Sequence, residues 1–139
     1  MKTRIHFFNE DITFRLHGII KRRTWLIRCI ESEGKTAGEV NFIFCSEAFL
    51  LKMNIDYLNH DTLTDVITFD YTEGDVISGD VFISLPQVKE NAILFSRTFN
   101  DELNRVMVHG VLHLCGYKDK TPAREKQMRL KEDEKLKML

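Results

Sequence analysis

The 139-residue sequence has no long hydrophobic run, and its apolar residues are spread along the whole chain. A helix that spans a membrane needs about 20 consecutive apolar residues. The N-terminal ten residues carry positive charge but only a short apolar patch, without the longer apolar region of a secretory signal. We therefore expect no contact with a membrane.

Cysteine is scarce and odd in number. Cys29, Cys45 and Cys115 lie far apart, each in an apolar setting. Secreted proteins of this size that depend on disulfides show an even number of regularly spaced cysteines. The pattern favours free thiols and a cytoplasmic location, where thiols stay reduced.

Strong positive charge is also missing. The formal net charge is −1, and residues 46–90 carry two basic and nine acidic side chains. A protein that binds nucleic acid by charge alone is strongly basic, so this chain does not belong to that class. The densest basic cluster, Lys21-Arg22-Arg23, is expected to be a solvated helix face.

What remains is an ordinary globular composition, with 43% hydrophobic and 29% charged residues. This length supports one domain, residues 1–139, with a core of its own. Periodicity and turn residues predict strands at 3–8, 37–45, 65–71 and 75–85 and helices at about 11–33, 47–58, 86–96, 100–116 and from 121 onward. The order of these elements predicts an α+β fold: a single mixed sheet of about four strands with helices packed across it, the last two strands pairing antiparallel.

Several local expectations accompany this assignment. The first helix would be capped by Asn9 or Asp11 and weakened at Gly18. A bulge or kink is expected at residues 78–80, and a polar loop at 59–64. Serine at 46 and 84 is expected to cap the helices that follow. The last helix is expected to pack through three apolar residues, Met128, Leu130 and Leu136.

The most informative stretch is the segment His109-Gly-Val-Leu-His113. On a helix, residues four apart lie on one face, with Cβ atoms about 5–6 Å apart. Gly116 can end the helix and let the chain return Asp119 toward both imidazoles. Two nitrogens and one carboxylate oxygen leave a tetrahedral position open, as in catalytic zinc sites. Two alternatives stay open: most such histidine pairs bind no metal, and Asp119 can instead cap the next helix.

Three segments resemble the successive motifs of the YbeY family of bacterial single-strand endoribonucleases: Thr64–Phe69, Gly79–Ser84 and His109–Tyr117. The resemblance covers about residues 40–120. It implies an α+β fold with one Zn²⁺ in a cleft, on a helix in the C-terminal part of the chain. It also implies cleavage of ribosomal RNA during maturation and ribosome quality control, with the small ribosomal subunit as partner.

Two positions depart from the family pattern. Three histidines hold the metal in the family, and His109 and His113 match two of them, while Asp119 stands at the third and Lys118 at the usual Asp before it. Carboxylate remains a good zinc ligand, although a harder donor set also admits Mn²⁺ or Ni²⁺. Leu58 replaces an arginine that is thought to face the RNA.

Another basic residue must therefore contact the phosphate. The candidates are Arg97, Arg105, Lys118 and Lys120. We favour Lys118 or Lys120 and predict His109, His113 and Lys118 as the catalytic set. Asp65 and Asp80, polar residues in apolar strands, either orient an imidazole or bond to nearby backbone. The general base, the oligomeric state and the cleaved RNA position stay open.

Two other functions fit parts of the pattern. In zinc metallopeptidases with this histidine spacing, a glutamate after the first histidine acts as general base; Gly110 occupies that place and argues against peptide hydrolysis. A non-catalytic, ribosome-associated binding protein would be consistent with Leu58, Asp119 and the near-neutral charge.

Overall fold

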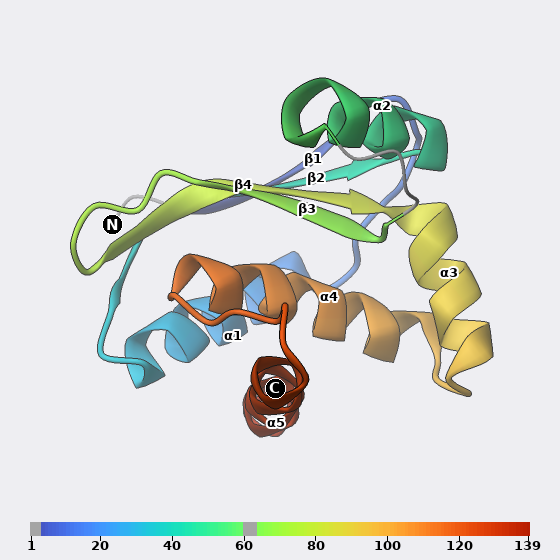
Figure 1. The fold of residues 1–139 in the computed structure, drawn as a ribbon. Helices are drawn as coiled ribbons and strands as arrows, with labels where there is room; N and C mark the ends of the chain where they lie inside the picture. Colours follow the sequence, from blue (N-terminus) through green and yellow to red (C-terminus); the bar gives the residue numbers. More distant parts are fainter. Residues whose placement is uncertain (1–3, 60–63) are drawn as a thin grey trace.

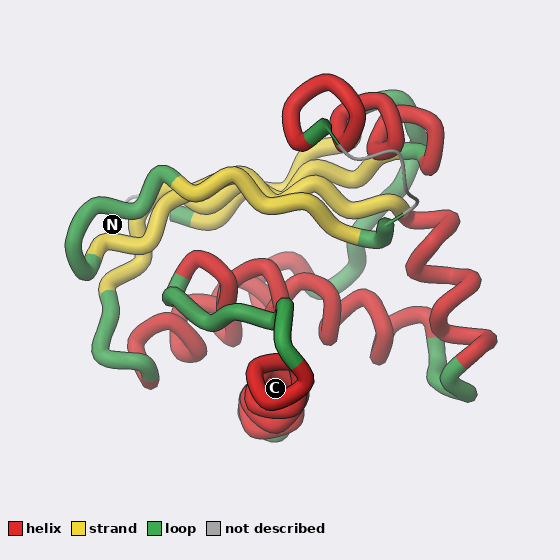
Figure 2. Tube along the Cα trace, in the orientation of Figure 1, coloured by secondary structure: helices red, strands yellow, loops and turns green. Residues whose placement is uncertain are grey.

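The computed structural model describes residues 4–59 and 64–139, which form one four-stranded mixed sheet with helices on both faces (Figures 1 and 2). The strands are β1 (Ile5–Asn9), β2 (Thr36–Cys45), β3 (Val66–Asp70) and β4 (Val76–Ser84). The helices are α1 (Ile19–Ser32), α2 (Glu47–Leu58), α3 (Leu85–Leu94), α4 (Phe99–Leu114) and α5 (Pro122–Leu136). The α+β fold expected from the sequence is confirmed.

The strands lie in the order β1-β2-β4-β3. β1, β2 and β4 are parallel, and β3 pairs antiparallel with β4, as predicted. The central strand β2 is buried on both faces: Phe42 and Phe44 alternate with Ile43 and Cys45. A strand that is apolar on both faces requires a helical layer on each side, and the sheet has both.

The two helical layers differ in size. α1 and α4 lie against one face of the sheet, and α5 packs on the side of α4 that faces away from it (Figure 1). The main core lies between the sheet and the layer formed by α1 and α4, and it includes Trp25, Phe42, Leu103 and Met107. α2 covers the opposite face through a smaller cluster centred on Leu50. α4 is therefore enclosed between the sheet and α5, which makes it a rigid base for side chains.

α4 approaches the sheet most closely at Gly110. A Cβ atom at this position would lie 2.7 Å from Cγ1 of Val81 and 3.4 Å from Cγ2 of Thr68. Any larger residue would push the helix away from β4. Gly110 thus sets the distance between the sheet and the helix that carries both histidines.

The first helix begins later than predicted. α1 starts at Ile19, because Gly18 precedes it in a left-handed conformation with φ of 64°, and no side chain caps the helix. A left-handed residue interrupts a right-handed helix. Asp11, predicted as a cap, instead accepts hydrogen bonds from the backbone N–H and the hydroxyl of Ser46, just before α2.

Other local expectations had mixed outcomes. Ser46 and Ser84 cap α2 and α3 as predicted, and Met128 is buried, but Leu130 is 60% exposed and does not pack. The register shift lies between Ala37 and Val40, so the extra residue is on β2, opposite the predicted bulge. The predicted loop at 59–64 falls largely outside the described residues.

Two expectations concern cysteines and membranes. All three cysteines are free thiols, in agreement with the sequence pattern. Among residues 4–59 and 64–139, no helix combines the length and the apolar character needed to cross a bilayer.

A charged cluster joins the end of α1 to α5 and to the loop after α4. Glu33 accepts hydrogen bonds from Lys135 at 2.6 Å, from Lys131 at 3.2 Å and from the hydroxyl of Tyr117 at 2.5 Å. Burial alone raises the pKa of Glu33, but these hydrogen bonds outweigh it and lower the pKa from 4.5 to about 2. Lys135 is only 1% exposed, and its charge is balanced by Glu33 and by Glu134, which lies 2.9 Å from its Nζ.

We predict that Glu33→Gln lowers the free energy of unfolding by about 1.5–3 kcal/mol near neutral pH, the range for hydrogen bonds to charged groups. Because the folded-state pKa of Glu33 is depressed, its contribution is present above about pH 4.5 and is lost as the pH falls toward about 2. Urea unfolding across this range measures the effect. The exposed residue Glu31 on the same helix gives the control Glu31→Gln, which should match the wild type; a constant difference down to the lowest pH would contradict the assignment.

Candidate metal centre

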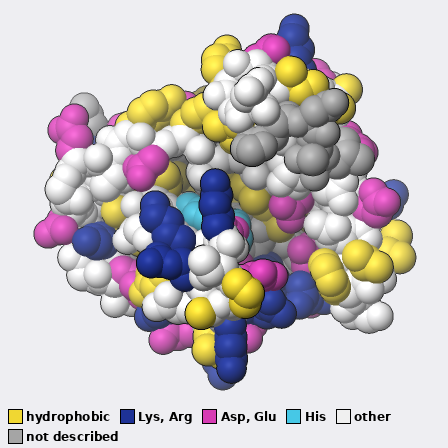
Figure 3. Space-filling view, viewed as in Figure 1, with side chains coloured by type: hydrophobic (Ala, Val, Ile, Leu, Met, Phe, Trp, Pro, Cys, Tyr) yellow, Lys and Arg dark blue, Asp and Glu magenta, His cyan; other side chains and the backbone are white. Residues whose placement is uncertain are grey.

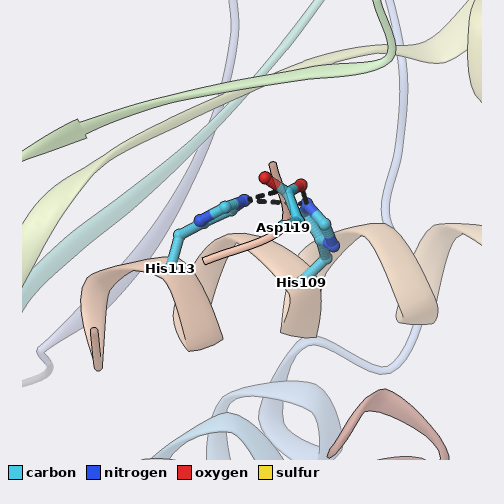
Figure 4. Close-up of side chains that lie close together, drawn as sticks. All are labelled: His109, His113 and Asp119. Carbon is cyan, nitrogen blue, oxygen red and sulfur yellow. Dashed lines mark hydrogen bonds and ion pairs between the residues drawn. The ribbon is translucent and has the colours of Figure 1, made fainter. Parts of the chain in front are cut away.

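Three side chains converge above α4 (Figure 4). His109 and His113 point from successive turns of α4, and Asp119 reaches them from the loop between α4 and α5. The two Nε2 atoms lie 3.0 Å apart, and Oδ2 of Asp119 lies 3.2 Å from Nε2 of His113 and 3.4 Å from Nε2 of His109. The structure therefore brings together the three residues that the sequence predicts as metal ligands.

Hydrogen bonds on the far side of each ring fix both imidazoles. Nδ1 of His109 donates to Oε2 of Glu132 at 2.6 Å, and Nδ1 of His113 donates to the backbone carbonyl of Tyr117 at 3.0 Å. Since Nδ1 carries the proton in both neutral rings, each Nε2 keeps its lone pair. Both lone pairs face the carboxylate of Asp119.

This donor set fits a divalent cation. Two lone-pair nitrogens and a carboxylate oxygen in mutual contact repel one another unless a positive charge lies between them. In a tetrahedral site with metal–ligand distances of about 2.0–2.1 Å, neighbouring ligand atoms lie about 3.3–3.4 Å apart. The separations of 3.0–3.4 Å observed here are close to that spacing.

The two imidazoles differ in basicity. Burial lowers the pKa of His109, but the hydrogen bond to Glu132 and the charges of Glu132, Asp119 and Asp65 raise it overall. Burial, together with the charge of His109, lowers the pKa of His113 below its usual value. An additional proton bound in this cluster therefore resides on the imidazole of His109. A metal ion that binds here would have to displace this proton.

His109 and Asp119 line a cleft of about 710 Å³ between β3, α3, α4 and α5. In the space-filling view, histidine atoms are visible between Lys and Arg side chains, beside a hollow in the surface (Figure 3). The candidate metal-ligand cluster of His109, His113 and Asp119 is thus accessible from solvent through this cleft.

Acidic side chains outnumber basic ones around the cleft, as far as residues 4–59 and 64–139 form it. Five carboxyl groups and three guanidinium groups of this part of the chain line it: Asp65, Glu102, Asp119, Glu125, Glu132, Arg97, Arg105 and Arg129. Arg97 pairs with Glu102 at 2.8 Å, and Arg105 pairs with Glu132 at 2.9 Å. A bound divalent cation would offset this acidic excess and reduce the repulsion of a phosphate group.

The residues considered for phosphate binding fall into two groups. Arg97 and Arg105 line the cleft, each in an ion pair with a carboxylate. Lys118 and Lys120 are exposed on the loop that carries Asp119. Leu58, where the resemblance noted in the sequence leads us to expect an arginine, is the last residue of α2 and is exposed.

Neither aspartate considered as an imidazole partner makes that contact. Oδ2 of Asp65 accepts a hydrogen bond from Asn91 at 3.2 Å, and Asp80 accepts one from Asn41 at 3.0 Å. Asp65 still acts on the site through its charge, which raises the pKa of His109.

The partner of His109 is Glu132 of α5, which sequence reasoning missed. Glu132 is buried in a helix that is otherwise highly charged. The sequence offered one signal: Met128 and Glu132 are four residues apart, so an inward-facing Met128 places Glu132 on the buried face too.

We predict that Glu132→Ala weakens Zn²⁺ binding by about 10- to 100-fold, the usual effect of removing a residue that orients a metal-binding histidine. Glu132→Gln should lose less, because its amide oxygen can still accept the Nδ1 proton. Titration against a competing chelator measures the affinity. Glu90→Gln, at an exposed position of α3, is the control; an unchanged affinity in Glu132→Ala would show that Glu132 does not support the site.

The sequence and the fold both match known proteins. The sequence model of the family "Endoribonuclease YbeY" matches residues 5–139. The chain is 55% identical over 131 residues to endoribonuclease YbeY of Flavobacterium psychrophilum, covering 94% of each chain. It is 50% identical over 133 residues to that of Cytophaga hutchinsonii, covering 95% of this chain and 93% of the other. The solution structure of TM1509 from Thermotoga maritima superposes with a TM-score of 0.68 at 30% identity, over 96% of this chain and 87% of that one.

Proposed function

Because this chain belongs to the YbeY endoribonuclease family, we propose that it is a metal-dependent endoribonuclease that cuts single-stranded ribosomal RNA. Its role would be ribosomal RNA maturation and ribosome quality control in the cytoplasm, with the small ribosomal subunit as partner. The observation that carries the proposal is the cluster of His109, His113 and Asp119, whose aimed donor atoms lie beside an open cleft.

The three clustered residues are proposed as ligands of one Zn²⁺ per chain, with Mn²⁺ or Ni²⁺ as other candidates for the mixed nitrogen and oxygen donors. Bound there, a divalent cation would supply Lewis acidity to a phosphoryl oxygen and to a water molecule. The protein's own part is to hold the donors: Glu132 and the carbonyl of Tyr117 keep both Nε2 atoms directed at the same point.

Other residues are proposed to manage the RNA. Lys118 precedes the ligand Asp119 on an exposed loop, so its ammonium group can reach a phosphate at the mouth of the cleft. Arg97 and Arg105 are less suited to bind a phosphate, because each already forms an ion pair with a carboxylate, Glu102 and Glu132 respectively.

The arrangement favours this reaction over peptide hydrolysis. At Gly110 a side chain would point at Val81 of β4 and at Thr68, into the helix–sheet interface. The general base that zinc peptidases carry at this place therefore has no space here.

We predict that chelation lowers the melting temperature and that added Zn²⁺ restores it, because an ion bound only to the native state stabilises it by mass action. Chelation should also abolish RNA cleavage, and added Zn²⁺ should restore the cleavage. An unchanged melting temperature on chelation would contradict a tightly bound ion.

We also predict that His113→Ala lowers the rate of cleavage of single-stranded RNA by at least 100-fold, an effect on the order of a lost catalytic interaction, while the variant keeps its circular dichroism spectrum. His17→Ala, at an exposed histidine outside the cleft, is the control. Residual cleavage equal to the wild type in repurified His113→Ala would instead favour the non-catalytic binding protein.

We further predict that Lys118→Ala raises KM for RNA by about 3- to 10-fold, the effect of about 1 kcal/mol expected of one exposed charge contact, and that this increase shrinks at high salt. Lys126→Ala, at an exposed lysine on α5, serves as the comparison. Equal KM values for the two variants would remove Lys118 from the proposed RNA contacts.

A further inference from the structure

The connection between α3 and α4 places an exposed aromatic ring at the cleft. Phe95 is 53% exposed and lines the cleft together with His109 and Asp119. Its neighbours Ile93 and Leu94 are also exposed, and Figure 3 shows hydrophobic side chains gathered on the right, at the lower end of α3. Three consecutive apolar side chains in solvent cost solubility, so their position beside a functional cleft is informative.

The ring is held in a defined position. Arg97 places its guanidinium carbon 5.2 Å from the centre of the Phe95 ring. The same guanidinium bonds to Glu102 at 2.8 Å, and Glu102 is buried. The backbone is fixed as well: Ser96 takes a left-handed conformation with φ of 54°, and the N–H of Arg97 donates to the carbonyl of Ala92. Phe95 is therefore a preorganised surface rather than a loose side chain.

Attraction of the Arg97 charge for phosphate does not explain why Arg97 lies against Phe95 at the cleft. The positive charge of Arg97 is already balanced by Glu102, and the cleft as a whole has more carboxylates than guanidinium groups. What Phe95 and Arg97 together still offer to a ligand is the flat face of the aromatic ring, polarised by the guanidinium. Flat faces of aromatic rings and of arginine are the surfaces on which unpaired RNA bases stack.

We infer that Phe95, backed by Arg97, is a stacking platform for one unpaired base of the RNA strand that occupies the cleft. This inference rests on the proposed function and deepens it, because a base paired in a duplex has no free face for Phe95. It supplies a structural reason for a preference for single strands that does not depend on net charge.

The platform is distant from the metal-ligand cluster. Arg97, which contacts Phe95, pairs with Glu102, and Glu102 lies seven residues before His109 on α4, roughly 10 Å along a helix axis at about 1.5 Å per residue. A base on Phe95 would belong to a different nucleotide from the one that is cut. Binding at a remote nucleotide contributes equally to ground state and transition state, so its loss should raise KM and leave kcat unchanged.

The test uses the full chain loaded with Zn²⁺ and a single-stranded oligoadenylate with one fluorescent end. Phe95→Ala should raise KM by about 5- to 100-fold, the range for loss of one stacked base, and Phe95→Tyr should restore it. Phe8 of β1 is 52% exposed and lies outside the cleft, so Phe8→Ala is the matched control. A fall in kcat with unchanged KM in Phe95→Ala, or equal effects in both alanine variants, would overturn the inference.

A second measurement does not require cleavage. Phe95→Trp places an exposed indole on the platform, whereas the native Trp25 is fully buried. Oligoadenylate should quench the fluorescence of Phe95→Trp and leave Phe8→Trp unchanged. Quenching without any cleavage by the wild type would refute the proposed function and keep the platform; wild-type cleavage without quenching would refute the platform alone. Self-association that Phe95→Ala abolishes would assign the ring to a contact between two copies, against this inference.

Discussion

The chemistry of the molecule depends on two hydrogen bonds that lie behind the histidines. Glu132 and the carbonyl of Tyr117 hold the Nδ1 protons of His109 and His113, and only in that state do both Nε2 lone pairs face Asp119. If either ring rotated, or if its proton moved from Nδ1 to Nε2, an N–H group would point at Asp119 in place of the lone pair that can bind a metal. The rest of the fold serves this constraint: Gly110 seats α4 on the sheet, and α5 brings Glu132 to the ring.

The charges around the site are also consistent with a bound cation. A cleft meant for a polyanion would be expected to be basic, yet carboxylates outnumber guanidinium groups here. The carboxylates serve to hold other groups in place: Glu132 holds His109, and Glu102 holds Arg97. A divalent cation would restore balance only at the point where the phosphate reacts. Under the proposed function, selectivity for RNA would come from shape and stacking as much as from charge.

Much of this could be predicted from the sequence, for local reasons. Spacing alone placed His109 and His113 on one helix face, and Gly116 allowed the return of Asp119. Alternation of apolar residues located β2, and Ser46 and Ser84 marked helix starts. The errors have two causes, one in the local backbone and one in a contact between residues distant in sequence. Apolar periodicity continued through Gly18, although its left-handed backbone stops the helix, and Glu132 could not be paired with His109 without knowing how α5 packs against α4.

The position of Glu132 on α5 has a consequence for how the protein would respond to the binding and loss of a metal ion. Since the carboxylate of Glu132 joins α5 to Arg105 and His109 of α4, ion binding at His109 and the attachment of α5 would be thermodynamically linked, and loss of the ion would weaken that attachment. The single tryptophan is placed to report this event: the indole N–H of Trp25 donates to the backbone carbonyl of Lys135 in α5. Intrinsic fluorescence thus gives an optical readout of whether the last helix is seated.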